Sequence, residues 1–379
     1  MKRIVIVANT SWFIYNFFRS SILELIKTHS EVYILAPWDD TSDKLIDLGC
    51  VYKDLYMDRN GANFSSEIRS IREIYFYFRE VKPDCILNFT PKINIYSCVC
   101  SKILGIKVIN TVSGLGSIFI DKGWKSYIGK ILLKVSQPFA DHVIFQNIDD
   151  MNIYLDNRLI NSERCSRVNG IGIDLKRFRP VQSRNDGNVK FILTGRMLES
   201  KGVRVFAKSA KIVKQKILDD VDFCDTNVQF SLLGFIDNTH AHSISESELL
   251  QFSKEYNVDY LGSTDNVFDI VKDYDCVVLP SFYREGVPQS LIEACAMGKP
   301  IITTDNVGCR DTVIDKESGY IIPIKDPHAL ADAMLKIIKL GHEGRLAFGV
   351  KGRQKAVRDF NHLKISKHYI DIINSLILE

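Results

Sequence analysis

Short apolar runs alternate with longer amphipathic segments along the whole chain of 379 residues. The short runs are rich in Val, Ile and Leu, which is typical of parallel strands covered by helices on both faces. Between them, apolar positions recur at helical spacing. This alternation predicts an α/β protein built on doubly wound parallel sheets. The predicted strands cover residues 3–8, 31–36, 85–89, 107–111 and 142–146, then 189–194, 228–233, 260–261, 276–280, 301–304 and 320–323.

The pattern restarts after a polar stretch at residues 170–188 that is rich in glycine and contains Pro180, the composition of an interdomain linker. We therefore predict two Rossmann-like domains, at residues 1–175 and 186–360, that face each other across a cleft. Residues 361–379 have helical apolar spacing and form a predicted terminal helix. Ligands of open α/β sheets bind beyond the carboxyl ends of the strands, so chemistry is expected in the loops there.

Composition and charge narrow the class of protein. Hydrophobic residues make up 46% and charged residues 25%, which is typical of soluble globular proteins. Residues 1–180 carry 24 Lys+Arg against 19 Asp+Glu, an excess that suits a phosphate, a diphosphate or a membrane surface as well as a plain solvated surface. The sequence contains no basic tract that would indicate nucleic-acid binding. The nine cysteines form no CxxC pair and favour a cytoplasmic location.

The most informative segment, SFYREGVPQSLIE, follows a buried-looking strand and opens a predicted helix near Pro288. The backbone N–H groups of Gly286 and Val287 lie where a helix N-terminus holds a phosphate oxygen. Glu285 and Glu293 would repel that phosphate, so they suit pairs of sugar hydroxyls instead. Alternatively, Glu285 only complements the positive end of the helix.

A second segment, GRMLESKG, lies directly after the strand predicted at 189–194 and before a helix. It places Arg196 and Lys201 between glycines, an arrangement that suits a diphosphate. When a sugar leaves a nucleotide, negative charge builds up on the distal phosphate, and fixed cations stabilise it without a metal. The alternative is a solvated loop.

Together the two segments resemble the Gly-Arg…Lys-Gly loop and the Glu-x7-Glu segment of family 4 glycosyltransferases, and the resemblance covers essentially the whole chain. It implies a GT-B fold, retention of anomeric configuration, no required metal or other cofactor, and a last helix that crosses back to the first domain. It also implies a division of roles in the donor site. Arg196 and Lys201 would bind the donor diphosphate, Glu285 the hexose and Glu293 the ribose, with Gly195, Gly286, Val287 and Pro288 completing the site.

The first half of the chain narrows the subfamily. Its segments NTSWFIYNFFR and TVSGLGSIFIDKGW resemble bacterial transferases that extend undecaprenyl-diphosphate-linked sugars, in particular α-1,3-N-acetylgalactosaminyltransferases. The first segment departs from the Gly-Gly loop common in family 4. The second has no histidine where many members have one, so no histidine base is assumed. The candidate acceptor-binding residues are Asn9, Thr10, Tyr15, Asn16, Arg19, Ser113, Gly114, Gly116 and Lys122. The alternatives are a tight turn without a ligand at residues 113–116 and plain surface cations at Arg19 and Lys122.

Residues 122–139 have the spacing of an amphipathic helix, with six large apolar residues on one side and Lys130 and Lys134 on the other. Such a face suits the inner surface of the plasma membrane, where a lipid-linked acceptor lies. More often such a pattern belongs to a helix packed on its own sheet. No run reaches the about 18 apolar residues of a membrane-spanning helix, so peripheral attachment is the form expected.

The expected activity is transfer of N-acetylgalactosamine from a UDP-sugar to an undecaprenyl-diphosphate-linked saccharide in polysaccharide, O-antigen or glycan assembly. A galactose or glucose donor stays open. A non-hydrolysing UDP-N-acetylhexosamine epimerase shares the architecture and is the main rival. A dehydrogenase is disfavoured because no G-x-G-x-x-G follows the first strand. The Asp-x-Asp triplets at 220–222 and 273–275 are interpreted as incidental rather than as metal ligands.

Overall fold

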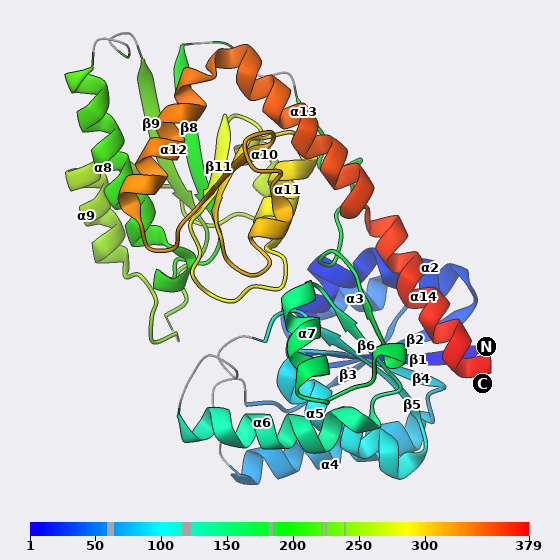
Figure 1. Cartoon of the computed structure of the whole chain (residues 1–379). Helices are drawn as coiled ribbons and strands as arrows, with labels where there is room; N and C mark the ends of the chain where they lie inside the picture. Colours follow the sequence, from blue (N-terminus) through cyan, green and yellow to red (C-terminus); the bar gives the residue numbers. More distant parts are fainter. Residues whose placement is uncertain are drawn as a thin grey trace. The chain divides into compact units, whose positions relative to one another are not determined.

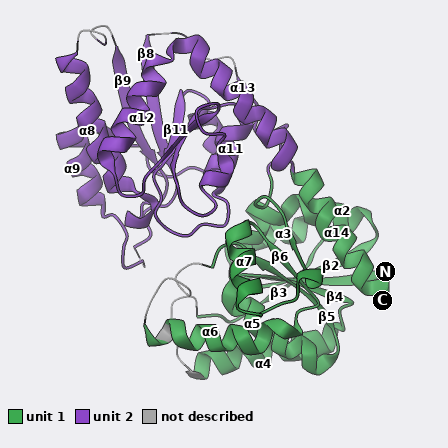
Figure 2. Ribbon diagram, in the orientation of Figure 1, with its two compact units in different colours: residues 1–172, 362–379 green, residues 173–361 purple. Residues whose placement is uncertain are grey.

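The computed structural model divides the chain into two units, each built on one sheet (Figures 1 and 2). It describes residues 1–58, 64–115, 123–181, 185, 187–220, 223, 226–238 and 240–378. Unit 1 comprises residues 1–172 and 362–379, and unit 2 comprises residues 173–361. The chain therefore leaves unit 1 within the predicted linker and returns to it for the last helix.

In its described residues, unit 1 has a seven-stranded sheet of order β3-β2-β1-β4-β5-β6-β7, with every pair parallel. Its strands are β1 (Lys2–Val7), β2 (Ser30–Ala36), β3 (Val51–Asp54), β4 (Cys85–Phe89), β5 (Lys107–Val112), β6 (His142–Phe145) and β7 (Cys165–Arg167). Its helices are α1 (Ser11–Phe13), the π-helical turn η1 (Ile14–Phe18), α2 (Arg19–Lys27), α3 (Ser42–Asp47), α4 (Phe64–Val81), α5 (Pro91–Leu104), α6 (Trp124–Ser136), η3 (Gln137–Phe139), α7 (Ile148–Asp156), η4 (Ser162–Arg164) and α14 (His362–Leu378).

The apolar strands of unit 1 are covered on both faces. Along β1, Ile4 and Ile6 pack into one core with α2 and the terminal helix α14, while Val5 and Val7 pack into a second core with α4, α5 and α7. Alternate residues of a strand point to opposite faces, so a continuous apolar run fills both cores. Tyr369 of α14 is fully buried beside η1 and β4, which ties the end of the chain into unit 1.

Unit 2 repeats this plan. Its described residues form a six-stranded sheet of order β10-β9-β8-β11-β12-β13, again with every pair parallel. The strands are β8 (Asn188–Thr194), β9 (Asn227–Leu233), β10 (Val258–Tyr260), β11 (Cys276–Leu279), β12 (Ile301–Thr304) and β13 (Gly319–Ile322). The helices are η5 (Glu199–Lys201), α8 (Val203–Asp219), α9 (Glu246–Tyr256), α10 (Val267–Val271), α11 (Gln289–Ala296), η7 (Arg310–Thr312), α12 (Pro327–Lys339) and α13 (Gly341–Asp359).

The helices of unit 2 also cover both faces of its sheet. Helices α8, α9 and α12 pack on one face, and α10, α11 and α13 on the other. The predicted fold class, α/β with two doubly wound parallel sheets, is therefore confirmed. The edge strands β3 and β7 were not predicted. Within the described residues, no helix has both the length and the hydropathy needed to cross a membrane.

Candidate functional site

The two segments predicted to bind the donor leave the same edge of the second sheet. Strands β8 and β11 are neighbours there (Figure 1). The strand order runs outward from them in opposite directions, toward β10 on one side and β13 on the other. Such a switch point is where open α/β sheets bind ligands. Residues 195–202 follow β8 and residues 281–288 follow β11. The fold therefore brings both predicted segments to the switch point of unit 2.

An ion pair joins these two segments. Nζ of Lys201 lies 2.6 Å from Oε1 of Glu285, and the two side chains are only 16% and 12% exposed. The hydroxyl of Ser281 lies 3.0 Å from the same carboxylate oxygen and 3.1 Å from the carbonyl oxygen of Ser200. A cation and a hydroxyl thus fix the carboxylate of Glu285 in position and compensate its charge.

Glycines allow the backbones of the site to approach closely. Gly202 has a φ of +79°, and a Cβ there would lie 2.2 Å from the carbonyl oxygen of Pro280. Gly308, after β12, has a φ of +76°, and a Cβ there would lie 1.9 Å from the carbonyl oxygen of Gly286. No other residue fits at either position without displacing the neighbouring loop. The loop after β12 therefore supports the backbone beside Glu285, a contribution that the motifs themselves do not reveal.

Arg196, the other predicted cation, has a different partner. Its Nη1 lies 3.5 Å from Oδ2 of Asp237, and its side chain is 43% exposed. The backbone around it continues the pairing of β8 with β9, because the N–H of Gly195 donates to the carbonyl of Leu233 at 3.0 Å. The two cations predicted to hold one diphosphate are thus each paired with a carboxylate. Their common role toward a diphosphate stays a prediction.

Glu293 lies within α11, which begins at Gln289, so Pro288 occupies the N-cap position immediately before the first turn. Burial raises the pKa of the Glu293 carboxyl to about 7, and the charge of Arg177 and a hydrogen bond from Gln289 partly oppose that shift. A carboxyl that titrates near neutral pH beside a switch-point loop is a candidate for ligand binding.

The predicted acceptor residues of the first loop lie at the carboxyl edge of the other sheet. Asn9 and Thr10 follow β1, and β1 and β4 form the switch point of unit 1. The hydroxyl of Thr10 caps α1 by accepting a backbone N–H at 3.0 Å. Tyr15 and Asn16 lie in the π-helical turn η1, a conformation frequent at functional sites. Arg19 follows, with its guanidinium carbon 5.5 Å from the Tyr15 ring centre.

The second predicted acceptor loop is described only in part. Ser113 and Gly114 follow β5 on the same edge, and Gly114 has a φ of +113°, which explains the glycine. Gly116 and Lys122 lie outside the described residues. In the sheet order β4 lies between β1 and β5, so the loop after β4 separates the two predicted acceptor loops.

That intervening loop contains Thr90, which the sequence pattern does not single out. Thr90 has a φ of +79° and a ψ of 144°, a strained region that is essentially restricted to glycine. Its hydroxyl oxygen is buried and has no hydrogen-bond partner among the described residues. A strained backbone with an unsatisfied buried hydroxyl, located at a switch point, marks a candidate ligand-binding residue. Because Thr90 precedes Pro91, its backbone conformations are restricted, but this restriction does not predict a positive φ.

Asp275, in the second Asp-x-Asp triplet, has a structural role. Its Oδ2 accepts the backbone N–H of Lys190 at 2.9 Å, and its Oδ1 lies 3.6 Å from Nε of Arg345. These contacts connect the start of β11 to β8 and α13. Asp222 of the first triplet lies outside the described residues.

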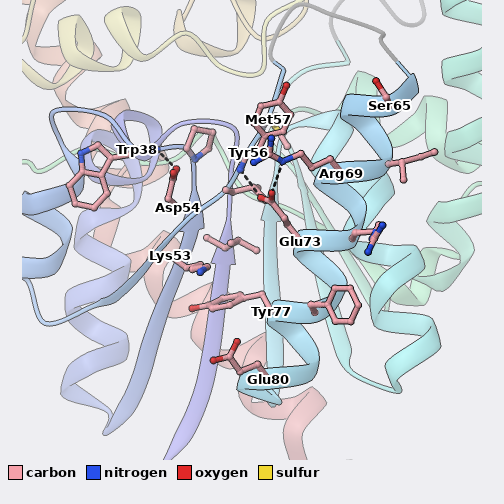
Figure 3. Close-up of a pocket in the computed structure, with 16 residues that line it drawn as sticks. Trp38, Lys53, Asp54, Tyr56, Met57, Ser65, Arg69, Glu73, Tyr77 and Glu80 are labelled. Atoms are coloured by element: carbon pink, nitrogen blue, oxygen red, sulfur yellow. Dashed lines mark hydrogen bonds and ion pairs between the residues drawn. The ribbon is translucent and has the colours of Figure 1, made fainter.

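A surface cavity of about 940 Å³ opens in unit 1 beside the edge strand β3 and helix α4 (Figure 3). Its lining contains none of the residues predicted to bind donor or acceptor. The guanidinium carbon of Arg69 lies 4.0 Å from the Tyr56 ring centre, and its Nε lies 2.9 Å from Glu73. The backbone N–H of Tyr56 donates to the same carboxylate at 2.9 Å. Because these groups satisfy one another, we assign no ligand to the cavity.

Both halves of the chain match known protein families. Residues 3–147 match the family described as Glycosyl transferase 4-like, and residues 188–339 match the family described as Glycosyl transferases group 1. The chain is 26% identical over 382 residues to the N,N'-diacetylbacillosaminyl-diphospho-undecaprenol alpha-1,3-N-acetylgalactosaminyltransferase of Campylobacter jejuni, an alignment that covers 95% of each protein.

A second relative is the UDP-Gal:alpha-D-GlcNAc-diphosphoundecaprenol alpha-1,3-galactosyltransferase of Escherichia coli. It is 23% identical over 328 residues, which cover 81% of this chain and 80% of that protein. Among solved structures, HepE of Anabaena in complex with UDP and glucose aligns with a TM-score of 0.77 at 12% identity, over 99% of this chain and 100% of that one. At that identity the likeness concerns the fold.

Proposed function

The chain belongs to the glycosyltransferases of GT-B fold, and we propose that it transfers a sugar from a UDP-sugar to an undecaprenyl-diphosphate-linked saccharide. We propose N-acetylgalactosamine as the first candidate sugar, because the Campylobacter relative named for that activity aligns over 95% of the chain. The Escherichia relative is named for a UDP-Gal donor, which supports UDP as the nucleotide and makes galactose the alternative. Both relatives are named for undecaprenol-linked acceptors and for α-1,3 linkages.

The observation that carries this proposal is the Lys201–Glu285 ion pair at the switch point of unit 2. A diphosphate that approaches this edge offers Lys201 two phosphate groups in place of one carboxylate. When Lys201 turns to the diphosphate, Glu285 is released to accept hydrogen bonds from the hydroxyls of the donor hexose. Ser281 continues to orient the carboxylate, because its hydroxyl lies 3.0 Å from the oxygen that also pairs with the lysine.

The reaction then needs charge stabilisation more than a nucleophile. An acceptor hydroxyl oxygen forms a bond to C1 of the donor sugar on the face from which the diphosphate leaves. The bond between C1 and the β-phosphate oxygen breaks, its electron pair stays with UDP, and the acceptor proton passes to a β-phosphate oxygen. Lys201 and Arg196 stabilise the departing charge, so the proposal requires no metal. Attack on this face retains the anomeric configuration and gives an α linkage.

Glu293 serves the nucleotide in this proposal. As an ionised carboxylate it accepts hydrogen bonds from the two adjacent hydroxyls of a ribose. Burial raises its pKa to about 7. Hydrogen bonds from the ribose hydroxyls would favour the ionised carboxylate and so oppose this shift. The switch point of unit 1 is the proposed acceptor side. Asn9 and Arg19 lie in the connection after β1, and Thr90 lies directly after β4.

The test incubates the full chain with labelled UDP-N-acetylgalactosamine, UDP-galactose, UDP-glucose or UDP-N-acetylglucosamine, each with and without an undecaprenyl-diphosphate-linked monosaccharide. Label should move to the lipid only when acceptor is present, and the new linkage should be α by NMR. Conversion of a UDP-N-acetylhexosamine without acceptor would identify an epimerase instead. A β product would refute retention, and loss of activity in EDTA that a divalent cation restores would refute metal independence.

A further inference from the structure

Helix α6 exposes its apolar side to solvent. Large hydrophobic side chains of α6 and the adjoining turn η3 are between 37% and 69% exposed, although they lie at helical spacing on one side. We call this surface the α6 stripe. It consists of Trp124, Tyr127, Ile128, Ile131, Leu132, Val135 and Phe139. A helix that packed on its own sheet through this side would bury these residues. Their exposure therefore excludes a packed helix as the explanation of the amphipathic pattern.

The opposite side of α6 faces the protein with small and polar residues. Ser126 and Ser136 are buried there, and Leu133 is the large apolar residue of α6 that is buried with them. The end of the helix is held by hydrogen bonds: the side-chain amide of Asn110, on β5, donates to the fully buried Gln137 at 2.9 Å. These contacts hold α6 through the side opposite the α6 stripe, whose side chains stay largely exposed.

The charged residues of α6 and η3 are all lysines. Residues 123–139 contain Lys125, Lys130 and Lys134 and no aspartate or glutamate. On the neighbouring helix α5, Lys102 places its ammonium group 5.9 Å from the ring centre of Phe139. This pattern favours an anionic partner. It is less favourable for pairing with a second copy through the same stripe, because both copies carry the same positive charges.

We propose that the α6 stripe docks the enzyme on an anionic lipid bilayer, with α6 lying in the plane of the interface. An apolar side with tryptophan and leucine, combined with lysines on the polar side, is the pattern of helices that insert to about 5–10 Å at the headgroup boundary. The lysines add attraction to anionic headgroups. The choice of a bilayer as occupant rests on the proposed function, since a lipid-linked acceptor is presented at a membrane surface.

The position of α6 in the chain supports this choice. The helix follows the predicted acceptor loop at Ser113 and Gly114 within a single connection, between β5 and β6. Because α6 follows this loop closely in the chain, docking of α6 on a membrane would keep the loop near the membrane surface. The same connection would thus provide both the membrane contact and part of the acceptor contact.

The test is co-sedimentation of the full chain with vesicles of phosphatidylcholine alone or with phosphatidylglycerol added. We expect binding to the anionic vesicles that weakens with added salt. The double variant Ile131→Glu/Val135→Glu should reduce this binding about tenfold or more, because two apolar contacts are lost and two repulsive charges are added. Both side chains are exposed, so the fold should survive, which circular dichroism checks.

A matched control is Leu250→Glu/Val350→Glu, which adds the same charges at exposed apolar positions of α9 and α13 in unit 2. Equal loss in both double variants would overturn the proposal, as would wild-type binding that does not exceed binding to neutral vesicles. A dimer in ultracentrifugation that Ile131→Glu/Val135→Glu dissociates, without vesicle binding, would assign the α6 stripe to a second copy instead. Vesicle binding needs neither donor nor acceptor, so its failure is distinguishable from failure of the proposed activity.

Discussion

Replacing Glu285 by glutamine separates the role of its charge from the role of its shape. Glutamine keeps an oxygen that accepts from Lys201 and Ser281, the groups at 2.6 and 3.0 Å. It loses the negative charge that compensates the lysine. Breaking a fully buried ion pair costs about 3–5 kcal/mol, and breaking an exposed pair costs about 0–1 kcal/mol. The two side chains are 16% and 12% exposed, and glutamine is a neutral replacement of the same shape. We therefore expect the free energy of unfolding to fall by about 1–2 kcal/mol.

The expected loss of turnover is much larger. A preorganised polar group that acts on the transition state is worth about 10²–10³-fold in rate. Glu285→Gln and Lys201→Met should each lose activity of this order. Glu317→Gln, an exposed glutamate of unit 2, is the control and should be active. The double variant Lys201→Met/Glu285→Gln should be more stable than the sum of the single losses predicts, because it leaves no unpaired charge.

The chain provides separate probes for the two units. Trp12, Trp38 and Trp124 all lie in unit 1, so tryptophan fluorescence follows unfolding of that unit, whereas circular dichroism follows the helices of both. In urea, Glu285→Gln should shift the dichroism transition of unit 2 and leave the fluorescence transition in place. Turnover within about threefold of wild type would refute the role of this carboxylate. A fluorescence shift as large as the dichroism shift would refute the local explanation.

Four further predictions follow from single positions. The pKa of Glu293 is about 7 and the ordinary value lies near 4.5, so the stability of unit 2 should fall as pH rises from about 4.5 to 7. UDP should bind more weakly below pH 7, where the carboxyl is protonated. Glu293→Gln should abolish both trends in calorimetry. Gly308→Ala should weaken UDP binding at least about tenfold by displacing the backbone of Gly286, although it touches no proposed ligand. Thr90→Gly should raise the urea midpoint of unit 1 by relieving about 1–3 kcal/mol of strain, yet lower turnover if the hydroxyl binds acceptor. Burial lowers the pKa of His142 to about 4, so stability of unit 1 should decrease as pH falls from about 6.5 to 4, and His142→Asn should flatten this dependence in tryptophan fluorescence.

The central strands of both sheets could be predicted because burial on both faces leaves a continuous apolar run. Strand β1 reads KRIVIV and β8 reads NVKFILT, and each has a buried carboxyl half. The edge strands gave no such signal. β3 reads VYKD and β7 reads CSR, with residues that are mostly half-buried or exposed, since an edge strand needs no apolar run to form. Their pairing depends on the neighbouring strand rather than on their own composition.

The donor segments could be predicted because they follow strands, but their contacts could not. Lys201 and Glu285 are 84 residues apart in sequence, and only the placement of β8 beside β11 makes them partners. The motif suggested two cations ready for one diphosphate, whereas each has a carboxylate partner in the fold. Thr90 shows the same limit, since a positive φ at a threonine is imposed by the surrounding structure.

Helix α6 shows what a periodic pattern can and cannot specify. The spacing of Trp124, Ile128 and Val135 predicts a helix with an apolar side, and the structure has one, but the period is the same whether that side is buried or exposed. The composition of the opposite side is the more informative signal. Besides the exposed Lys130 and Lys134, the side of α6 away from its apolar residues carries Ser126 and Ser136, and these small residues are buried against the protein. An apolar side opposed by small residues and lysines, without large apolar residues to pack on the protein apart from Leu133, therefore predicts a helix whose apolar side faces outward to a partner.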